Sequence, residues 1–153
     1  MSAETRLIEL EIELPEPFAP AGNYVPAVIS GNLLFTAGQV PRRDGDFACI
    51  GTVGADLTLE DGFEAARLCC LGGLAVARRE LGSLDRILRV VKVNGFVRSA
   101  PGFSMQPKVI NGASDLLVDL FGENGRHARA ALGVSELPLG VAVEIDFIFE
   151  IAQ

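Results

Sequence analysis

The stretch HARAALGVSELPLGVAVEIDFIFEIA, from His127 to Ala152, decides how the rest of the chain can fold. In its second half, apolar side chains occupy every other position from Val141 to Ile151. This period of two predicts a β-strand with one face buried against a core. The first half predicts a shorter strand, and Leu137-Pro138-Leu139-Gly140 separates the two. We expect these two strands to be neighbours in one sheet.

The opposite face of the second strand is mixed. It carries Glu144 and Asp146 together with Ala142, Ile148 and Glu150. A face of this kind suits solvent, a subunit interface or a binding site, and the pattern leaves all three open.

Two segments upstream have the period of an amphipathic helix. The first follows Thr58-x-x-Asp61, which resembles a capping box, and ends at Gly82. The second has an apolar stripe from Val109 to Phe121 and stops at Gly122. Gly72 and Gly73 would weaken the first helix by about 1 kcal/mol each relative to alanine. We expect a close approach to the sheet backbone to compensate.

Shorter elements fill the remainder of the chain. Leu7 to Leu14 alternates apolar residues with glutamates, which predicts a half-exposed strand that Pro15 ends. Pro26–Ile29 and Leu33–Ala37 flank a turn cluster and predict a β-hairpin. Residues 41–56 are mostly polar or glycine and predict a solvated loop without chemistry.

Between the helices, residues 84–98 predict another strand. Ile87, Val91, Val93 and Val97 would share one face, and Val90, Lys92, Asn94 and Phe96 the other. Helices with one apolar stripe and strands with one strongly apolar face predict a two-layer α+β sandwich in a single domain, residues 1–153. The mixed sheet face then calls for self-association.

Composition excludes several classes of protein. A net charge of -7 argues against nucleic-acid binding, because phosphate neutralisation requires clustered Lys and Arg. The odd cysteine count, Cys49 with the adjacent pair Cys69 and Cys70, suits a reducing compartment and predicts packing roles for the pair. No zinc-binding spacing is present. The acidic N-terminus does not resemble a signal peptide or membrane span, so a cytoplasmic location is expected.

Four stretches resemble the RidA/YjgF family of imine deaminases, also labelled endoribonuclease L-PSP-like. The C-terminal one combines Ala128-Arg129, Leu137-Pro138 and the strand that contains Val143-Glu144-Ile145. Upstream, in the family's order, are Gly22-Asn23-Tyr24-Val25-Pro26-Ala27-Val28, Gly31-Asn32-Leu33-Leu34-Phe35 and Ala37-Gly38-Gln39-Val40-Pro41. The resemblance covers the chain from about Pro20 onward, and the longer N-terminus is similar to a longer branch of the family.

The resemblance implies a fold, an assembly and a reaction. The fold is a mixed sheet with two helices on one face, chorismate-mutase-like, in a homotrimer with sites in the clefts between subunits. The reaction is hydrolysis of 2-enamino or 2-imino acids to 2-oxo acids and ammonia, without metal or organic cofactor. By the same resemblance, Arg129 would hold the substrate carboxylate and Glu144 would handle the hydrolytic water. A guanidinium can bind a carboxylate bidentately, and a carboxyl group can move protons.

Four further positions are implied as substrate-binding. The amide of Gly38 and the carbonyl of Ala131 match the family's main-chain contacts, Tyr24 would close the cleft from a neighbouring subunit, and Asn111 lies on the second predicted helix. The chain departs from the family pattern at Ala37, which is usually Ser, at His127, which is commonly Pro, and at Ala131, which is frequently Cys.

Other interpretations remain open. From the residues alone, Arg129 and Glu144 would form a cross-strand ion pair, Tyr24 would be a half-buried aromatic, and His127 would have a surface or cap role. A non-catalytic module that binds or senses a 2-oxo acid would use Arg129 without needing Glu144. A third function, endoribonuclease-like activity, fits the acidic balance poorly.

Overall fold

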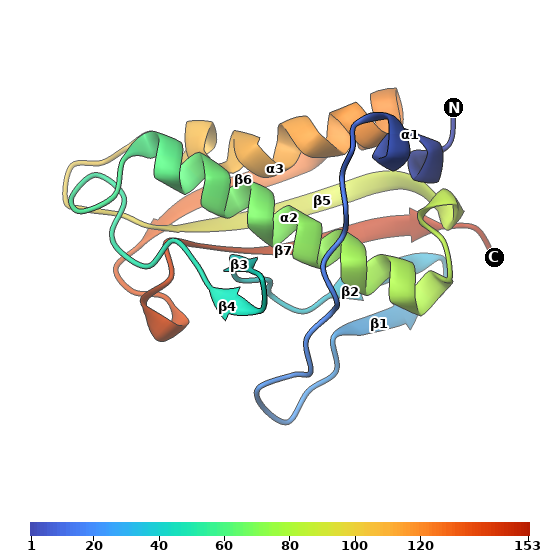
Figure 1. The fold of residues 1–153 in the computed structure, drawn as a ribbon, viewed down its shortest axis with the longest axis horizontal. Coiled ribbons are helices and arrows are strands. Elements are labelled where there is room, and N and C mark those ends of the chain that lie inside the picture. Colours follow the sequence, from blue (N-terminus) through green and yellow to red (C-terminus); the bar gives the residue numbers. More distant parts are fainter.

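A five-stranded sheet carries two long helices on one face in the computed structural model, which describes residues 1–153 (Figure 1). The sheet contains, in chain order, β1 Ala27–Ser30, β2 Leu33–Thr36, β5 Ile87–Arg98, β6 Ala128–Val134 and β7 Val143–Ile151. The helices are α1 Ala3–Glu9, α2 Leu59–Leu81 and α3 Gln106–Phe121, with 3-10 turns at Leu84–Arg86, Gly122–Gly125 and Pro138–Gly140. The predicted two-layer α+β sandwich is confirmed.

The strand order is β1-β2-β7-β5-β6, so the two strands of the His127–Ala152 stretch are not neighbours and that prediction was wrong. β5 lies between them and pairs antiparallel with β7 and parallel with β6. The parallel pair follows from connectivity, because β5, α3 and β6 form a strand-helix-strand crossover. β7 buries alternate side chains along its length and takes a central place, whereas the half-exposed β6 lies at the edge.

Helix α2 begins and ends where the sequence predicted. The Thr58 side chain accepts the N–H of Asp61, and the Asp61 carboxylate accepts the N–H of Thr58, so the capping box is complete. Gly82 ends the helix in the left-handed conformation, with φ of 84°.

The glycine pair within α2 allows close packing against side chains. A Cβ on Gly73 would lie 2.6 Å from the Phe147 ring, and one on Gly72 would lie 3.0 Å from Gln39 Oε1. The expected approach to the sheet backbone was therefore wrong, because an aromatic ring and an amide occupy that space.

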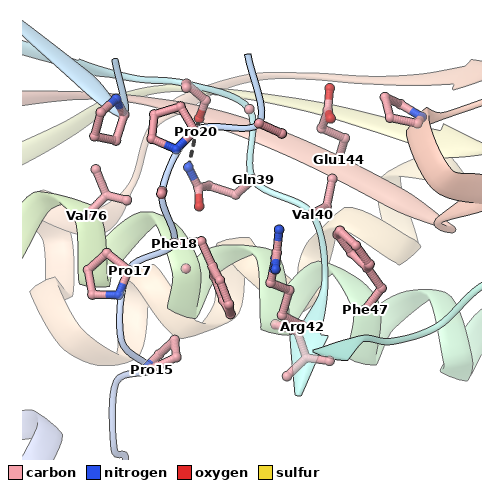
Figure 2. Close-up of a pocket in the computed structure, with 18 of the residues that line it drawn as sticks. Pro15, Pro17, Phe18, Pro20, Gln39, Val40, Arg42, Phe47, Val76 and Glu144 are labelled. Atoms are coloured by element: carbon pink, nitrogen blue, oxygen red, sulfur yellow. Dashed lines mark hydrogen bonds between the residues drawn. The ribbon is translucent and has the colours of Figure 1, made fainter. Parts of the chain in front are cut away.

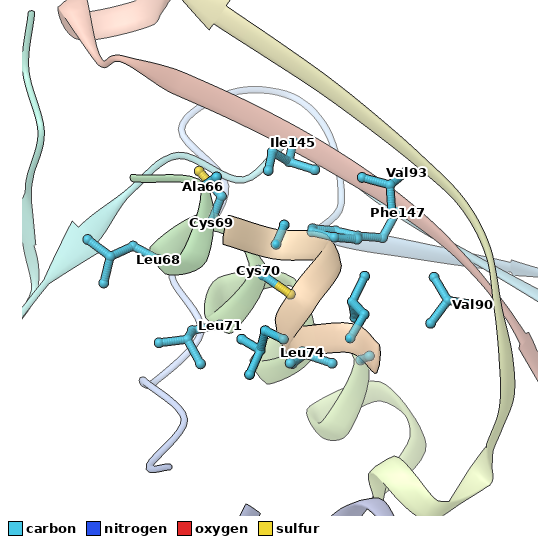
Figure 3. Packing of buried hydrophobic residues seen from close by; sticks show 14 of the residues in the cluster. Ala66, Leu68, Cys69, Cys70, Leu71, Leu74, Val90, Val93, Ile145 and Phe147 are labelled. Carbon is cyan, nitrogen blue, oxygen red and sulfur yellow. The ribbon is translucent and has the colours of Figure 1, made fainter. Parts of the chain in front are cut away.

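The core lies between the helices and the sheet and is a cluster of 30 buried residues. Figure 3 shows Cys70 of α2 on the side of the helix that faces Phe147 of the sheet, and Leu74 and Val93 belong to the same cluster. Cys69 and Cys70 are fully buried, and burial raises the pKa of both thiols. Their predicted packing role is confirmed.

The strand predicted over Leu7–Leu14 was wrong, because residues 3–9 form α1. Ser2 caps this helix by accepting the Thr5 N–H. Ala3 and Leu7 are four residues apart and both are buried, so a helical spacing coexists with the alternation that suggested a strand. After α1 the chain runs without regular structure across α2 (Figure 1). We call its Pro15–Ala21 part the proline strap.

Two other local predictions had different outcomes. The hairpin of β1 and β2 is confirmed, with Gly31 at φ 61° in its turn. The loop of residues 41–56 instead contains a small ribbon, β3 Arg42–Arg43 and β4 Asp46–Phe47, joined by a turn with positive φ.

A bulge in β5 changes which valine enters the core. The register with β7 shifts between Val90 and Lys92. Val90 is 1% exposed and belongs to the core, whereas Val91 is only partly buried. The face assignment predicted for these two valines was wrong, because the bulge interrupts the strict alternation on which it depended.

The sheet face away from the helices is open. Val28 and Leu132 are each 53% exposed there, and Phe35 is 38% exposed. Polar groups lie on the same face, including Asn94, whose amide donates to Asp146 at 2.7 Å. None of the helices combines the length and the apolar character that a membrane-spanning helix requires.

Candidate functional site

Arg129 lies on the edge strand β6 and reaches toward α3. It is paired with Val93, which is buried under the helices, so its side chain is on the helix side of the sheet. Its Nη1 donates to Asn111 Oδ1 at 2.7 Å and to Ser114 Oγ at 3.1 Å. Nε and Nη2 make no hydrogen bond within the chain. The guanidinium is thus held at one end, and its remaining donors are free for a ligand.

His127 contacts Ser114 and so supports the hydrogen bond between Ser114 and Arg129. Its Nδ1 lies 2.7 Å from the Gly125 carbonyl oxygen and its Nε2 lies 2.8 Å from Ser114 Oγ. Because a carbonyl can only accept, Nδ1 carries the proton and Nε2 accepts from the Ser114 hydroxyl. His127 is half-buried and bridges Gly125 to the Ser114–Arg129 contact.

Folding should become less favourable as His127 is protonated. Burial, followed by the charge of Arg129, lowers the pKa of His127 below 6.5, although the Gly125 carbonyl opposes this. As pH falls below about 6.5 the unfolded chain takes up the proton first. The contribution of His127 to the free energy of unfolding is therefore full above about pH 6.5. It decreases as the pH falls from there to the pKa of His127 in the folded protein, and it does not change further below that pKa.

Urea unfolding of the wild type and His127→Gln from pH 5 to 8 tests this. The wild type should be most stable relative to the variant above pH 6.5 and should lose that advantage on acidification. A difference that does not change with pH would show that His127 has an unshifted pKa.

Glu144 lies in a separate cluster. On β7 it alternates with the buried Val143 and Ile145, so it is on the open side of the sheet. Its carboxyl covers Gly38, where a Cβ would lie 3.0 Å from Glu144 Cδ. The N–H of Gly38 makes no hydrogen bond within the chain. Burial, followed by the charge of Asp146, raises the pKa of Glu144.

One cavity of about 200 Å³ is lined by Glu144, Gly38 and Tyr24. Figure 2 shows Glu144 among the residues that line it. Its walls come from the proline strap, residues 37–42, the 3-10 turn after β6 and the outer face of α2. Tyr24 is 53% exposed, and its hydroxyl accepts the Ala21 N–H at 3.4 Å. Three of the predicted site residues therefore meet at one cavity.

The predicted site residues form two groups within one chain. Arg129, Asn111 and Ala131 lie at the edge formed by β6 and α3, where Ala131 is partly buried two residues after Arg129. Arg129 and Glu144 are two strands and three residues apart, roughly 14 Å, on opposite faces of the sheet. The cross-strand ion pair is therefore wrong.

Sequence reasoning missed Ser114 and Arg42. Ser114 follows Asn111 by three residues on α3, so both side chains face Arg129, and this helical spacing was a usable signal. Arg42 lines the cavity although its segment was predicted to be a solvated loop. No group of three or more His, Cys, Asp or Glu side chains lies together in a way that could hold a metal ion.

Comparison with known proteins extends these observations. A family model described as "YjgF/chorismate_mutase-like, putative endoribonuclease" matches residues 4–151. Protein TCP17 of Trypanosoma cruzi is 49% identical over 146 residues, which are 95% of this chain and 91% of that protein.

Two solved structures are similar throughout. Atu1372 of Agrobacterium tumefaciens, of unknown function, has a TM-score of 0.91 and 48% identity, covering 98% of this chain and 92% of that one. A Shewanella oneidensis MR-1 protein with the endoribonuclease label has a TM-score of 0.95 and 36% identity, covering 99% of this chain and 100% of that one.

Proposed function

The chain belongs to the YjgF/chorismate mutase-like family, and from this premise we propose that it hydrolyses 2-enamino or 2-imino acids to 2-oxo acids and ammonia. The observation that carries the proposal is the pair of half-sites. In the first half-site, Asn111 and Ser114 hold one nitrogen of the Arg129 guanidinium, and its other N–H donors are free. In the second, the half-buried carboxyl group of Glu144 has a raised pKa. A second copy of the chain would bring them together.

In this site Arg129 binds the substrate carboxylate. Asn111 and Ser114 fix Nη1, so the free donors keep one orientation and less side-chain entropy is lost on binding. The Gly38 N–H and the Ala131 carbonyl orient the ligand, and Tyr24 closes the cleft. None of these contacts requires a cofactor.

Glu144 transfers protons. A water oxygen adds to the imine carbon while Glu144 takes one of its protons, and Glu144 then returns a proton to the nitrogen. Glu144 next takes the proton of the new hydroxyl group and passes it to the nitrogen, so the carbonyl forms, the C–N bond breaks and ammonia leaves. A raised pKa suits both steps, because it makes the carboxylate a stronger base and brings its titration closer to neutral pH, so that it can both accept a proton and give it back.

A homotrimer would complete the site. The open sheet face carries Val28, Phe35 and Leu132, each more than a third exposed. Covering them with the same face of further copies removes apolar surface from water and closes the assembly by symmetry.

Light scattering should give three times the 16.2 kDa chain mass at micromolar concentration. Leu132→Asp places a charge on the open face and should shift the mass toward the monomer. Ile8→Asp is the matched control, because Ile8 is 79% exposed on α1 and should leave the trimer intact. A wild-type monomer would contradict the proposed assembly.

Endoribonuclease-like activity, the third function that the family resemblance implies, is disfavoured. The 20 Asp and Glu residues outnumber the 13 Lys and Arg residues, and the net charge of -7 disfavours contacts with phosphates. We therefore propose no ribonuclease activity and expect weak RNA binding at most.

A reducing compartment such as the cytoplasm is the location that we propose. All three cysteines are unpaired, and Cys69 and Cys70 are buried in the core.

The reaction is tested by measuring 2-oxo acid release from imines freshly generated by an amino-acid oxidase. Added protein should accelerate release beyond the spontaneous rate. If no imine is hydrolysed faster, the same groups would serve a 2-oxo acid binding module instead, which needs Arg129 alone.

A further inference from the structure

The cavity beside Glu144 contains a cation that the proposed reaction does not use. Arg42 opens strand β3 and lines the cavity together with the proline strap. Its guanidinium carbon lies 3.6 Å from the centre of the Phe18 ring and 4.2 Å from that of Phe47. Figure 2 shows Arg42 between these two rings, pointing toward the side of the cavity where Gln39 and Val40 lie.

We call the rings of Phe18 and Phe47 the aromatic clamp of Arg42. The clamp limits the directions from which Arg42 can bind a ligand. Aromatic rings lie against the flat guanidinium, so its N–H donors, which lie in the plane, point past the rings. The guanidinium of Arg42 makes no hydrogen bond or ion pair within the chain. Two carboxyl groups line the cavity, Glu16 and Glu144, and neither pairs with it. Burial lowers the pKa of Arg42, which reflects the cost of holding a cation without an anion.

The cavity has room for a small ligand. Its volume of about 200 Å³ equals the liquid volume of about seven waters, enough for a small organic acid. Three prolines, Pro15, Pro17 and Pro20, restrict the backbone of the strap that encloses it. These prolines reduce the backbone freedom that the strap would lose when a ligand binds, which favours binding.

We propose that Arg42 binds the second carboxylate of a dicarboxylic substrate, whose first carboxylate is held by Arg129. This inference rests on the proposed function, because it names the substrate class of the same site. A carboxylate is flat and accepts two parallel N–H donors, so it fits the open edge of a clamped guanidinium. The preferred substrates would be imines derived from acidic amino acids.

Calorimetric binding of two five-carbon acids tests this without catalysis. Wild type should bind 2-oxopentanedioate at least about tenfold more tightly than 2-oxopentanoate, because only the former has a second carboxylate. Arg42→Met keeps an apolar chain between Phe18 and Phe47 and should abolish the preference while retaining affinity for 2-oxopentanoate. Arg43→Met is the matched control, because Arg43 pairs with Glu64 outside the cavity and should keep the preference.

The outcomes separate this inference from the proposed reaction. Equal affinity of wild type for the two acids, no binding of the diacid, or a preference that survives Arg42→Met would overturn the role of Arg42, whatever the enzyme hydrolyses. A preference lost in Arg42→Met would support it even if no imine were hydrolysed. Should Arg42→Met fail to fold, Arg42→Lys must reduce the preference, because lysine lacks the planar fork.

Discussion

Glu144→Gln should slow imine hydrolysis by about 10²- to 10⁴-fold and leave the affinity for a 2-oxo acid nearly unchanged. Glutamine has nearly the same shape and keeps a hydrogen-bonding amide above Gly38, but it cannot exchange a proton. The measurement is paired: calorimetric affinity for a 2-oxo acid, and the rate of imine hydrolysis, on the wild type and the variant. Loss of rate without loss of affinity identifies a proton-transfer residue.

Glu150→Gln is the control for this prediction. Glu150 lies on the same face of β7, six residues further along, and accepts a hydrogen bond from Asn32 at 3.3 Å outside the cavity. Its substitution should leave the rate unchanged. A Glu144→Gln variant as fast as the wild type would remove Glu144 from the reaction and favour the binding module.

Gly112→Ala should destabilise the protein by about 3 kcal/mol or more. Gly112 lies on α3 where it meets α2, and a Cβ there would overlap the carbonyl oxygen of Phe63. The backbone of a packed helix can move aside only at a large cost in free energy, so α2 and α3 must separate. Because Asn111 is the adjacent residue, the same shift should weaken its hold on Arg129.

Gly72→Ala is the matched control for Gly112→Ala. Its new Cβ would meet only Gln39 Oε1, the end of a flexible side chain, and alanine has the better helix propensity by about 1 kcal/mol. Urea unfolding should place the two variants at least about 2 kcal/mol apart. Equal stabilities would show that the α2–α3 contact tolerates a methyl group.

Local signals in the sequence predicted those elements that depend on nearby residues. The alternation of Val143 to Ile151 gave the central strand, and the Thr58 capping box gave the start of α2. Local patterns failed where two periods coexist, as at Ala3 and Leu7 in α1, or where a bulge shifts the register, as at Val90. In these places the partner that decides the outcome is far away in the sequence.

The candidate site was predicted residue by residue but not in its arrangement. Arg129, Asn111, Glu144, Gly38 and Tyr24 came from the family resemblance, and the structure groups them into two clusters. Their separation follows from β5 lying between β6 and β7, which is a long-range pairing. Arg42 was missed because its role depends on the distant Phe18, and the turn after it resembles any exposed turn.

The central claim is that Arg129 of one subunit acts with Glu144 of another. Its most direct test is to mix Arg129→Lys and Glu144→Gln chains in equal amounts, unfold and refold them together, and measure imine hydrolysis. Each variant alone should be nearly inactive. Averaged over all trimers that form at random, about a quarter of the sites would combine a native Arg129 with a native Glu144, so about a quarter of the wild-type rate should return. No recovery, in trimers shown by mass spectrometry to be mixed, would contradict a site shared between subunits.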